Sequence, residues 1–308
     1  MLGGVLMSSS PTPLSALDGA SVWLNSEPLT ATGLRGRVVL VDFWTYSCVN
    51  WLRTLPYVRA WHERYRDHGL VVVGAHAPEF GFEHDLHNVR GAVAELDVDY
   101  PVVIDNEFAI WRAFENHYWP AVYLVDGDGR VQFHHFGEEA YEETERAVQR
   151  LLGVDEELVD VDAGGVAEAA DWDALGSPET YVGYARGERR TDRRADELAL
   201  NQWALAGDWS VGEESAVLEA GTGSIAYRFQ ARDLNLVLTA SGAPIRFTVR
   251  LDGEPPGDAH GLDVDESGEG TLSEPRMYQL VRQSGARQRT FEITFLEPGA
   301  RAYVFTFG

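Results

Sequence analysis

The sequence predicts two domains, an α/β domain followed by an all-β domain. From Arg37 to about Gly153, short β-branched runs alternate with helical segments, a pattern typical of a sheet with crossover helices. Beyond residue 175, apolar residues recur instead at every second position, as in half-buried strands. A chain of 308 residues with 44% apolar composition is long enough for two hydrophobic cores.

The first domain is expected to contain a central sheet of five strands flanked by four helices. The strands are predicted at residues 38–43, 70–76, 101–104, 121–125 and 131–136. Between the last two lies Asp126-Gly127-Asp128-Gly129, which has the composition of a hairpin turn. The helices are predicted from Cys48 to about residue 67, ending before Gly69, and over 85–96, 107–116 and 139–152.

Acidic and small residues dominate the segment between the two patterns, which predicts a linker or a peripheral helix. We therefore assign residues 1–33 to an N-terminal segment, 34–153 to the α/β domain, 154–176 to an acidic linker and 177–308 to the second domain. Many short strands separated by Gly, Pro and Asp turns predict a β-sandwich or jelly roll there. Its alternating apolar positions include Ile225, Tyr227, Phe229, Ile245, Phe247, Val249, Leu251, Phe291, Ile293 and Phe295.

The charge of the chain excludes several partners and chemistries. The formal net charge is -24, which argues against nucleic acids and anionic membranes as partners. All 25 basic residues are arginine, so Schiff-base chemistry and a phosphate-binding lysine are excluded. We expect no cofactor.

The single cysteine sets further limits. It excludes an internal disulfide and a thiolate zinc site supplied by this chain alone, and it fits a cytosolic protein. The N-terminus fits a signal peptide poorly, and no stretch approaches membrane-spanning length. We therefore expect a cytoplasmic location, and an extracytoplasmic one if an upstream leader is missing from the sequence.

Cys48 is the candidate nucleophile. A buried strand, VVLVDFW, is followed by a short loop and then by a helix with Cys48 at its N-terminal end. Unpaired N–H groups and the helix dipole favour the thiolate there and lower a thiol pKa from about 8.5 into a reactive range. The alternative is a buried structural cysteine.

This arrangement resembles the thioredoxins, and specifically the TlpA-like group. Asp42 lies six residues before Cys48, where thioredoxins keep a buried acid, and Pro56 lies eight residues after it, where their active-site helix is kinked. Trp119-Pro120 resembles the cis-proline element that faces the cysteines in that fold. The resemblance implies a thioredoxin-like domain with Cys48 and Pro120 in its site.

The resemblance extends over most of the chain, from about Leu34 onward. WTYSCVNWLRTLPYVRAW, HAPEFGFEHD and NHYWPAVYLVD together are similar to the extracytoplasmic portion of DipZ-type proteins. In that family a β-sandwich resembling a carbohydrate-binding module follows the thioredoxin domain, and SPETYVGYARG fits its beginning.

The sequence departs from the family at one position. The family carries a second cysteine three residues after the first, but this chain has Trp51 there. The second cysteine normally resolves the mixed disulfide, so this chain does not complete the usual cycle alone. The role of Asp42, which in thioredoxins assists the second cysteine, is therefore open.

Three functions stay open. Cys48 exchanges with protein disulfides or low-molecular-weight thiols, and an external thiol resolves the adduct. Alternatively, a peroxide oxidises Cys48 to a sulfenic acid, which an external thiol reduces. Thr45 lies three residues before Cys48, as in the Thr-x-x-Cys motif of peroxiredoxins, although Val41 stands where those proteins have proline. In the third, the fold is a non-catalytic scaffold whose β-sandwich binds a glycan or a protein. Trp203 and Trp209 are candidates for a glycan platform, with core packing favoured.

Other polar residues give weaker signals. Four side chains could approach Cys48 and tune its pKa, with ordinary surface or supporting roles as the alternative: His76, Glu79, Glu83 and His117. Arg53, one turn beyond Cys48, could support a thiolate there, but it is expected to be solvated.

Two patterns resemble metal sites. Residues 263–274 match the spacing of a calcium loop, but their flanks favour an acidic hairpin. His134 and His135 are expected on opposite faces of a strand, so they form no paired metal site by themselves.

Overall fold

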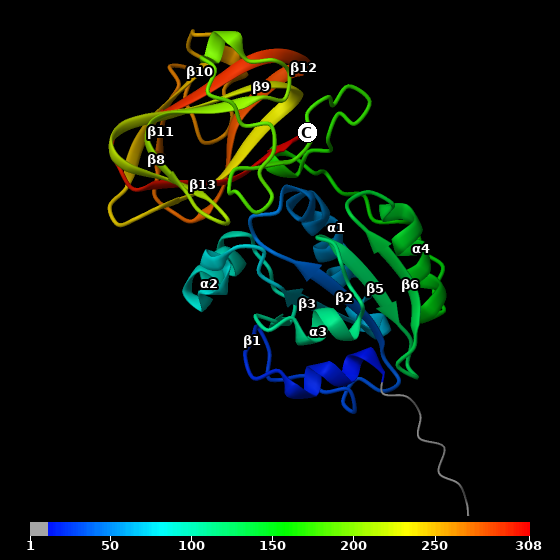
Figure 1. Ribbon diagram of the computed structural model, residues 1–308. Helices are drawn as coiled ribbons and strands as arrows, with labels where there is room; N and C mark the ends of the chain where they lie inside the picture. The colour runs from blue at the N-terminus through cyan, green and yellow to red at the C-terminus, as the bar shows by residue number, and fades with distance from the viewer. Residues whose placement is uncertain (1–11) are drawn as a thin grey trace, which may run out of the picture. The chain divides into compact units, whose positions relative to one another are not determined.

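The computed structural model describes residues 12–308 and divides into two compact units between Asp162 and Ala163 (Figure 1). Its first unit contains a mixed sheet with helices, and the second is built from strands. The first unit comprises η1 (Pro13–Gly19), β1 (Trp23–Leu24), β2 (Val38–Trp44), α1 (Val49–Tyr65), η2 (Arg66–His68), β3 (Leu70–His76), η3 (Gly81–His84), α2 (Leu86–Glu95), β4 (Val102–Ile104), α3 (Ala109–Ala113), β5 (Ala121–Val125), β6 (Val131–Phe136) and α4 (Tyr141–Leu152).

The sheet of the first unit has the strand order β1-β4-β3-β2-β5-β6. β2 pairs in parallel with β3 and antiparallel with β5, so it lies in the middle of the sheet. β4 continues the parallel part, whereas β1 and β6 pair antiparallel at the two edges. This mixed topology with flanking helices is a thioredoxin fold, as the sequence predicts.

Side chains of β2 alternate between the two faces of the sheet. Phe43 packs edge-on against Trp111 of α3 and against Phe114, while Trp44 stacks on Trp51 of α1 on the other face. All seven residues of β2 are buried. The alternation sends Asp42, two positions before Trp44, toward α1.

The elements of the first unit that were not expected from the sequence include η1 and β1. η1 contributes Leu14 and Leu17 to the core, and β1 adds a two-residue edge strand in which Trp23 pairs with Val103. A strand of two residues is too short to show an alternation, so periodicity does not reveal it.

The helix predicted at 107–116 is shorter in the structure. Phe108 has a φ of 54° and Glu115 one of 53°, and such left-handed residues do not continue a right-handed helix. The carboxylate of Asp105 accepts hydrogen bonds from the N–H groups of Ile110 and Trp111. α3 therefore spans Ala109–Ala113.

The segment expected to be a linker is divided between the two units. Its first part is held on the first unit, where Glu156 forms an ion pair with Arg64 and Glu145 accepts a hydrogen bond from the N–H of Val159. Its second part belongs to the second unit and includes η4 (Gly165–Ala167), after which Glu168 forms an ion pair with Arg282.

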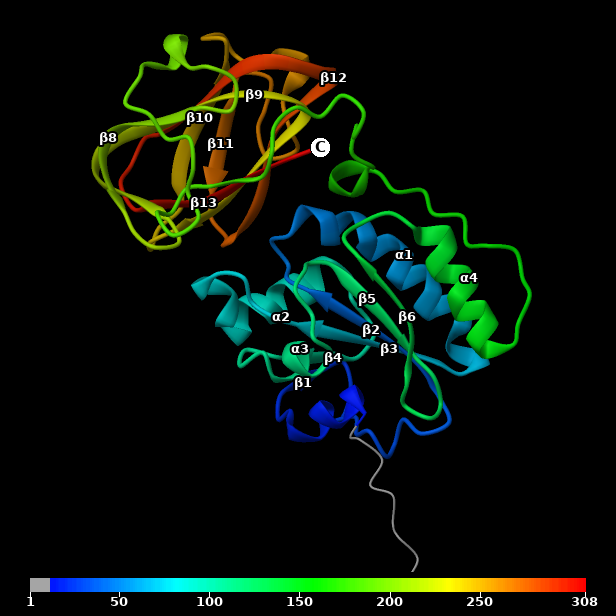
Figure 2. The same ribbon diagram turned by 45° about the vertical axis from the view of Figure 1, so that its right-hand side comes forward.

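The second unit is an antiparallel sheet with the order β11-β10-β12-β9-β13-β7, and β8 pairs with β9. Figure 2 shows the long strands β9 and β12 curving as they pass through it. This confirms the predicted all-β domain. Besides η4, its elements are β7 (Thr180–Tyr181), η5 (Ala195–Glu197), β8 (Trp203–Val211), β9 (Ala216–Ala240), β10 (Ile245–Leu251), η6 (Gly257–Ala259), β11 (Glu269–Leu272), β12 (Arg276–Phe295) and β13 (Ala300–Phe307).

The predicted alternation places the expected residues in the core of the second unit. Every second residue of β10 is buried, and Phe291, Ile293 and Phe295 of β12 are fully buried. Opposite them, Ile225 pairs with Ile293 and Tyr227 with Phe291 in the β9–β12 register. The period-2 pattern therefore identified the inward faces of these strands correctly.

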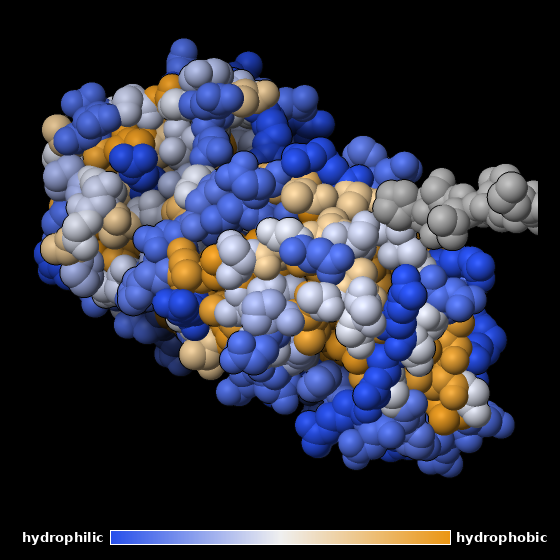
Figure 3. Space-filling model, turned by 90° about the horizontal axis from the view of Figure 1, so that it is seen from below, coloured by the Kyte–Doolittle hydropathy of each residue, from blue (hydrophilic) through white to orange (hydrophobic). Residues whose placement is uncertain are grey.

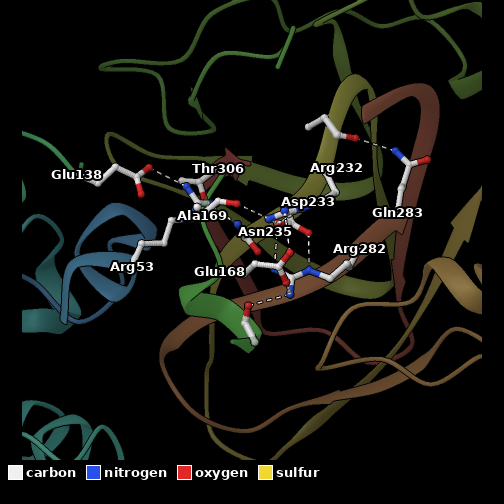
Figure 4. Close-up of polar contacts among 12 residues, drawn as sticks. Arg53, Glu138, Glu168, Ala169, Arg232, Asp233, Asn235, Arg282, Gln283 and Thr306 are labelled. Carbon is white, nitrogen blue, oxygen red and sulfur yellow. Dashed lines mark hydrogen bonds and ion pairs between the residues drawn. The ribbon is translucent and has the colours of Figure 1, made fainter. Parts of the chain in front are cut away.

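A network of charged residues lies at one place in the second unit (Figure 4). Asp233 of β9 is fully buried and pairs with Arg282 of β12 at 2.7 Å and with its neighbour Arg232 at 2.7 Å. Both arginines also contact Glu168, which connects the segment after η4 to the sheet.

Figure 3 shows a mainly polar face of the molecule. On the face seen in Figure 3, hydrophilic residues predominate and hydrophobic residues form separate patches. Within residues 12–162, the exposed large hydrophobic residues are Tyr118, Val131 and Phe136. Across residues 12–308, the helices are all too short or too polar to cross a membrane.

Candidate functional site: a single cysteine at a helix N-terminus

Cys48 is the N-cap residue of α1. Its backbone is extended, with φ of -81° and ψ of 114°, and its carbonyl oxygen accepts the N–H of Leu52. The side chain is half-buried, and its Sγ atom lies 3.9 Å from the carbonyl oxygen of Trp119. The Trp119-Pro120 peptide bond is cis, as the resemblance implied. The structure therefore brings the cis-proline element to Cys48.

Trp51 occupies the position of the family's second cysteine and contacts the buried acid. Its side chain is fully buried, and its indole N–H donates a hydrogen bond of 2.9 Å to Oδ2 of Asp42. The hydroxyl of Tyr100 lies 3.4 Å from the same oxygen. Burial raises the pKa of Asp42 to about 7, although these two hydrogen bonds act in the opposite direction.

Aromatic packing encloses this acid. The rings of Trp44 and Trp51 stack at 4.3 Å, and a Cβ atom placed on Gly74 would lie 2.9 Å from the Trp44 indole nitrogen and 3.0 Å from the ring of Tyr100. Only glycine leaves room at this point of β3, directly beside Asp42 in the strand register. Asp42 thus lies in a closed, aromatic environment.

A second buried carboxyl, Glu83 of η3, lies beside the loop that carries the cysteine. Its Oε1 accepts a hydrogen bond of 2.5 Å from the hydroxyl of Ser47, which directly precedes Cys48. Burial raises the pKa of Glu83 to about 7, and the hydroxyls of Ser47 and Thr45 act in the opposite direction. Thr45 is itself fully buried.

His76 ends β3 inside the same region. Its ring packs edge-on against Trp44 and stacks on Tyr46, and neither ring nitrogen has a hydrogen-bond partner. Burial lowers the pKa of His76 to about 3, so the imidazole stays neutral at physiological pH. His76 is therefore a buried neutral neighbour of the loop.

The expectation that Arg53 is solvated is wrong. Arg53 is 2% exposed and forms a 2.9 Å ion pair with Glu138, which Figure 4 shows. The acid follows β6, 85 residues away in the sequence, so no local pattern announced it. Of the other two candidates, His117 is exposed and Glu79 lies in the turn before η3, where its N–H donates to Glu83.

The remaining sequence candidates have structural roles. Trp203 is 1% exposed and donates its indole N–H to the carbonyl of Glu188, while Trp209 packs edge-on against Phe295. These contacts support the core interpretation of both tryptophans. His134 and His135 pair with successive residues of β5, as expected for neighbours on a strand.

The acidic segment 263–274 holds its own hairpin together. Asp263 pairs with Arg276 at 2.6 Å, and Asp265 accepts hydrogen bonds from the hydroxyl of Ser267 and the N–H of Glu269. Among residues 12–308, no three His, Cys, Asp or Glu side chains are grouped closely enough to hold a metal ion.

Sequence reasoning missed two members of the site. Ser47 connects Cys48 to Glu83, and Tyr100 contacts Asp42 from the segment before β4. The position of Ser47 next to the cysteine was a usable signal. Tyr100 lies 58 residues from Asp42 and had none.

Comparisons with known proteins identify the family of the chain. Residues 14–152 match the Redoxin family model, and residues 177–308 match the model described as thioredoxin like C-terminal domain. Thiol-disulfide oxidoreductase YkuV of Bacillus subtilis is 31% identical over 140 residues, which are 46% of this chain and 94% of YkuV. The chain belongs to the redoxin family.

The two-domain order of this redoxin also occurs in a longer relative. Protein DipZ of Mycobacterium tuberculosis is 33% identical over 308 residues, which cover 95% of this chain but 42% of DipZ. The chain thus spans about two fifths of that relative. Among solved structures, a thioredoxin-like protein in the oxidized form is 31% identical, with a TM-score of 0.42, and the match covers 47% of this chain and 97% of that one.

Proposed function

We propose that this redoxin is a single-cysteine thiol-disulfide exchange protein with Cys48 as nucleophile. The observation that carries the proposal is the position of Cys48 at the N-cap of the 17-residue helix α1, with its sulfur beside the Trp119-Pro120 element. Membership of the redoxin family supports thiols and disulfides as partners. The N-terminal end of a helix stabilises the thiolate, which is the attacking form.

The exchange takes place in two steps. The Cys48 thiolate attacks one sulfur of a disulfide, so that a bond from Cys48 to that sulfur forms and the original S–S bond breaks. The second sulfur leaves with the bonding electrons and takes up a proton. An external thiol then loses its proton and attacks the mixed disulfide, which transfers the bound group to that thiol and returns Cys48 as thiolate.

The external thiol is required because Trp51 takes the place of an internal one. Its indole is fully buried and hydrogen-bonded to Asp42, so the family's buried acid serves a tryptophan here. The acid is available neither to a second cysteine nor to a resolving step within the chain. The thiol-peroxidase alternative gains no support from Thr45, which is fully buried and so does not present its hydroxyl to a peroxide from solvent.

The proposal is tested with a peptide joined to glutathione by a mixed disulfide. We expect peptide thiol release that depends on both protein and added glutathione, and mass spectrometry of the quenched reaction should show glutathione on Cys48. The variant Cys48→Ser should release peptide at the uncatalysed rate. Undiminished release by that variant would contradict the proposal, and rapid sulfenic acid formation with peroxide but no disulfide exchange would favour the peroxidase.

Two further expectations accompany the proposal. A glycan or protein ligand for the second unit is tested by binding assays on the whole chain. A cytoplasmic location is tested by fractionation of cells that express the natural gene.

A further inference from the structure

Glu83 is held in place by three hydrogen bonds from two segments. Its Oε2 accepts the N–H groups of Glu79 at 2.6 Å and Phe80 at 2.9 Å, which fixes the carboxyl within its own turn. Its Oε1 accepts the Ser47 hydroxyl from the loop between β2 and α1. A fully buried carboxyl is thus joined to the residue next to Cys48.

The other buried carboxyl of the region is engaged elsewhere. Asp42 accepts the indole N–H of Trp51 and lies against Tyr100 and the aromatic stack. The partners of Asp42 come from α1 and from the segment before β4, whereas one of the partners of Glu83, Ser47, belongs to the cysteine loop itself. Glu83 is therefore the buried acid with a direct connection to that loop.

We propose that Glu83 is the positioning residue of Cys48: it holds the loop through Ser47, and its charge state controls how readily the thiol ionises. This inference rests on the proposed function, because it assigns the acid–base control of the same nucleophile. Glu83 acts through Ser47 and through its charge, without contact to a substrate.

The groups around Glu83 do not neutralise its carboxylate, so its charge can act on the ionisation of Cys48. The loop presents the hydroxyls of Ser47 and Thr45, and the turn before η3 presents Glu79, whose charge also raises the pKa of Glu83. His76 on β3 stays neutral and does not neutralise a carboxylate, and His84, which follows Glu83, is exposed. In a buried environment a charge acts strongly on a neighbouring ionisation.

The sign of the effect follows from these groups. Below a pH of about 7 Glu83 is protonated, and its carboxyl carries no charge that opposes the Cys48 thiolate. Above that pH the carboxylate disfavours a second negative charge nearby and makes the thiol harder to ionise. We therefore expect the two groups to titrate as a coupled pair.

The experiment measures the rate of Cys48 alkylation by iodoacetamide from pH 5 to 10 in the whole chain. In the wild type we expect two inflections, one of them near pH 7, and in Glu83→Gln a single inflection and faster alkylation at pH 8. Glutamine fits the site, since its oxygen can accept the two N–H groups and its amide can donate to Ser47. Glu145→Gln, which changes another buried carboxyl, is the matched control and should keep both inflections.

An inflection near pH 7 that persists in Glu83→Gln, or that disappears in Asp42→Asn, would overturn the inference. Carbon-13 NMR of the Glu83 carboxyl in the wild type gives an independent test, because its titration should coincide with the inflection, and a separate midpoint would contradict the proposal. If the rate of Cys48 alkylation changes with the protonation of Glu83 but the protein does not exchange with disulfides, the proposed function is refuted and this inference still holds.

Discussion

The two units bury an aspartate in opposite ways. Asp233 lies on β9 between the guanidinium groups of Arg232 and Arg282 (Figure 4), so its charge is paired on two sides. Asp42 lies on β2, equally inaccessible, but its partners are the neutral indole of Trp51 and the neutral hydroxyl of Tyr100.

The difference separates a structural charge from a titrating one. An ion pair keeps a buried carboxylate ionised and fixes the chain segments that supply its partners. A buried carboxyl with neutral partners has a raised pKa, so it changes charge near neutral pH, as Asp42 and Glu83 do. Groups of this second kind gather at functional sites, and in this chain Asp42 lies on the strand that leads into the Cys48 loop while Glu83 contacts that loop through Ser47.

The largest expected effect comes from removing the paired aspartate. Asp233→Ala leaves two arginines without their buried partner, and we expect the free energy of unfolding of the second unit to fall by roughly 3–5 kcal/mol. Denaturant unfolding measures this. Asp208→Ala on β8, where the aspartate is exposed, is the control and should change stability little. An equal loss in both variants would mean that the ion network has no special weight.

The pH dependence of stability distinguishes the unpaired aspartate. The pKa of Asp42 is about 7 in the folded chain, and its ordinary value is 3.8. Between pH 3.8 and about 7, Asp42 therefore binds a proton in the folded state but not in the unfolded state. Stability therefore falls as pH rises through this window, and the Asp42 contribution between pH 5 and 7 is about 2 kcal/mol.

The variant Asp42→Asn isolates this contribution. The stability difference between wild type and variant should change with pH up to about 7 and then level off, because Glu83 and His76 titrate equally in both proteins and cancel. Unfolding curves at a series of pH values provide the measurement. A difference independent of pH would show that Asp42 is ionised in the folded chain.

The smallest effect is expected at the outer member of the ion network. The side chain of Glu168 is 47% exposed and pairs with both Arg232 and Arg282. When Glu168 is replaced, both arginines keep their ion pairs with Asp233. Glu168→Gln should therefore cost less than about 1 kcal/mol, as for other exposed pairs. A loss of stability as large as that of Asp233→Ala would contradict the distinction between the buried partner Asp233 and the exposed partner Glu168.

The sequence predicted those parts of the molecule that depend on local order. The strand before Cys48, the helix after it and the alternation in β9, β10 and β12 follow from periodicity, and the structure confirms them. The cis bond at Pro120 followed from the family resemblance. Each of these features is contained in a short stretch of chain.

The errors and omissions concern contacts between distant segments. Arg53 was expected in solvent because its partner Glu138 comes from another element, and the bond from Ser47 to Glu83 spans 36 residues. Burial of a polar side chain depends on what the fold places opposite it, which local sequence patterns do not specify. The position of Trp51 was evident, but its hydrogen bond to Asp42 was not.

The stacked indoles of Trp44 and Trp51 give the site an optical property. Two indole rings 4.3 Å apart absorb as an electronically coupled pair, and one of them donates its N–H to a carboxyl that titrates near pH 7. Ultraviolet circular dichroism and tryptophan emission should therefore change with the protonation of Asp42. The ring that replaces the second cysteine thus serves as a built-in spectroscopic reporter of the chemistry beside it, with no label attached.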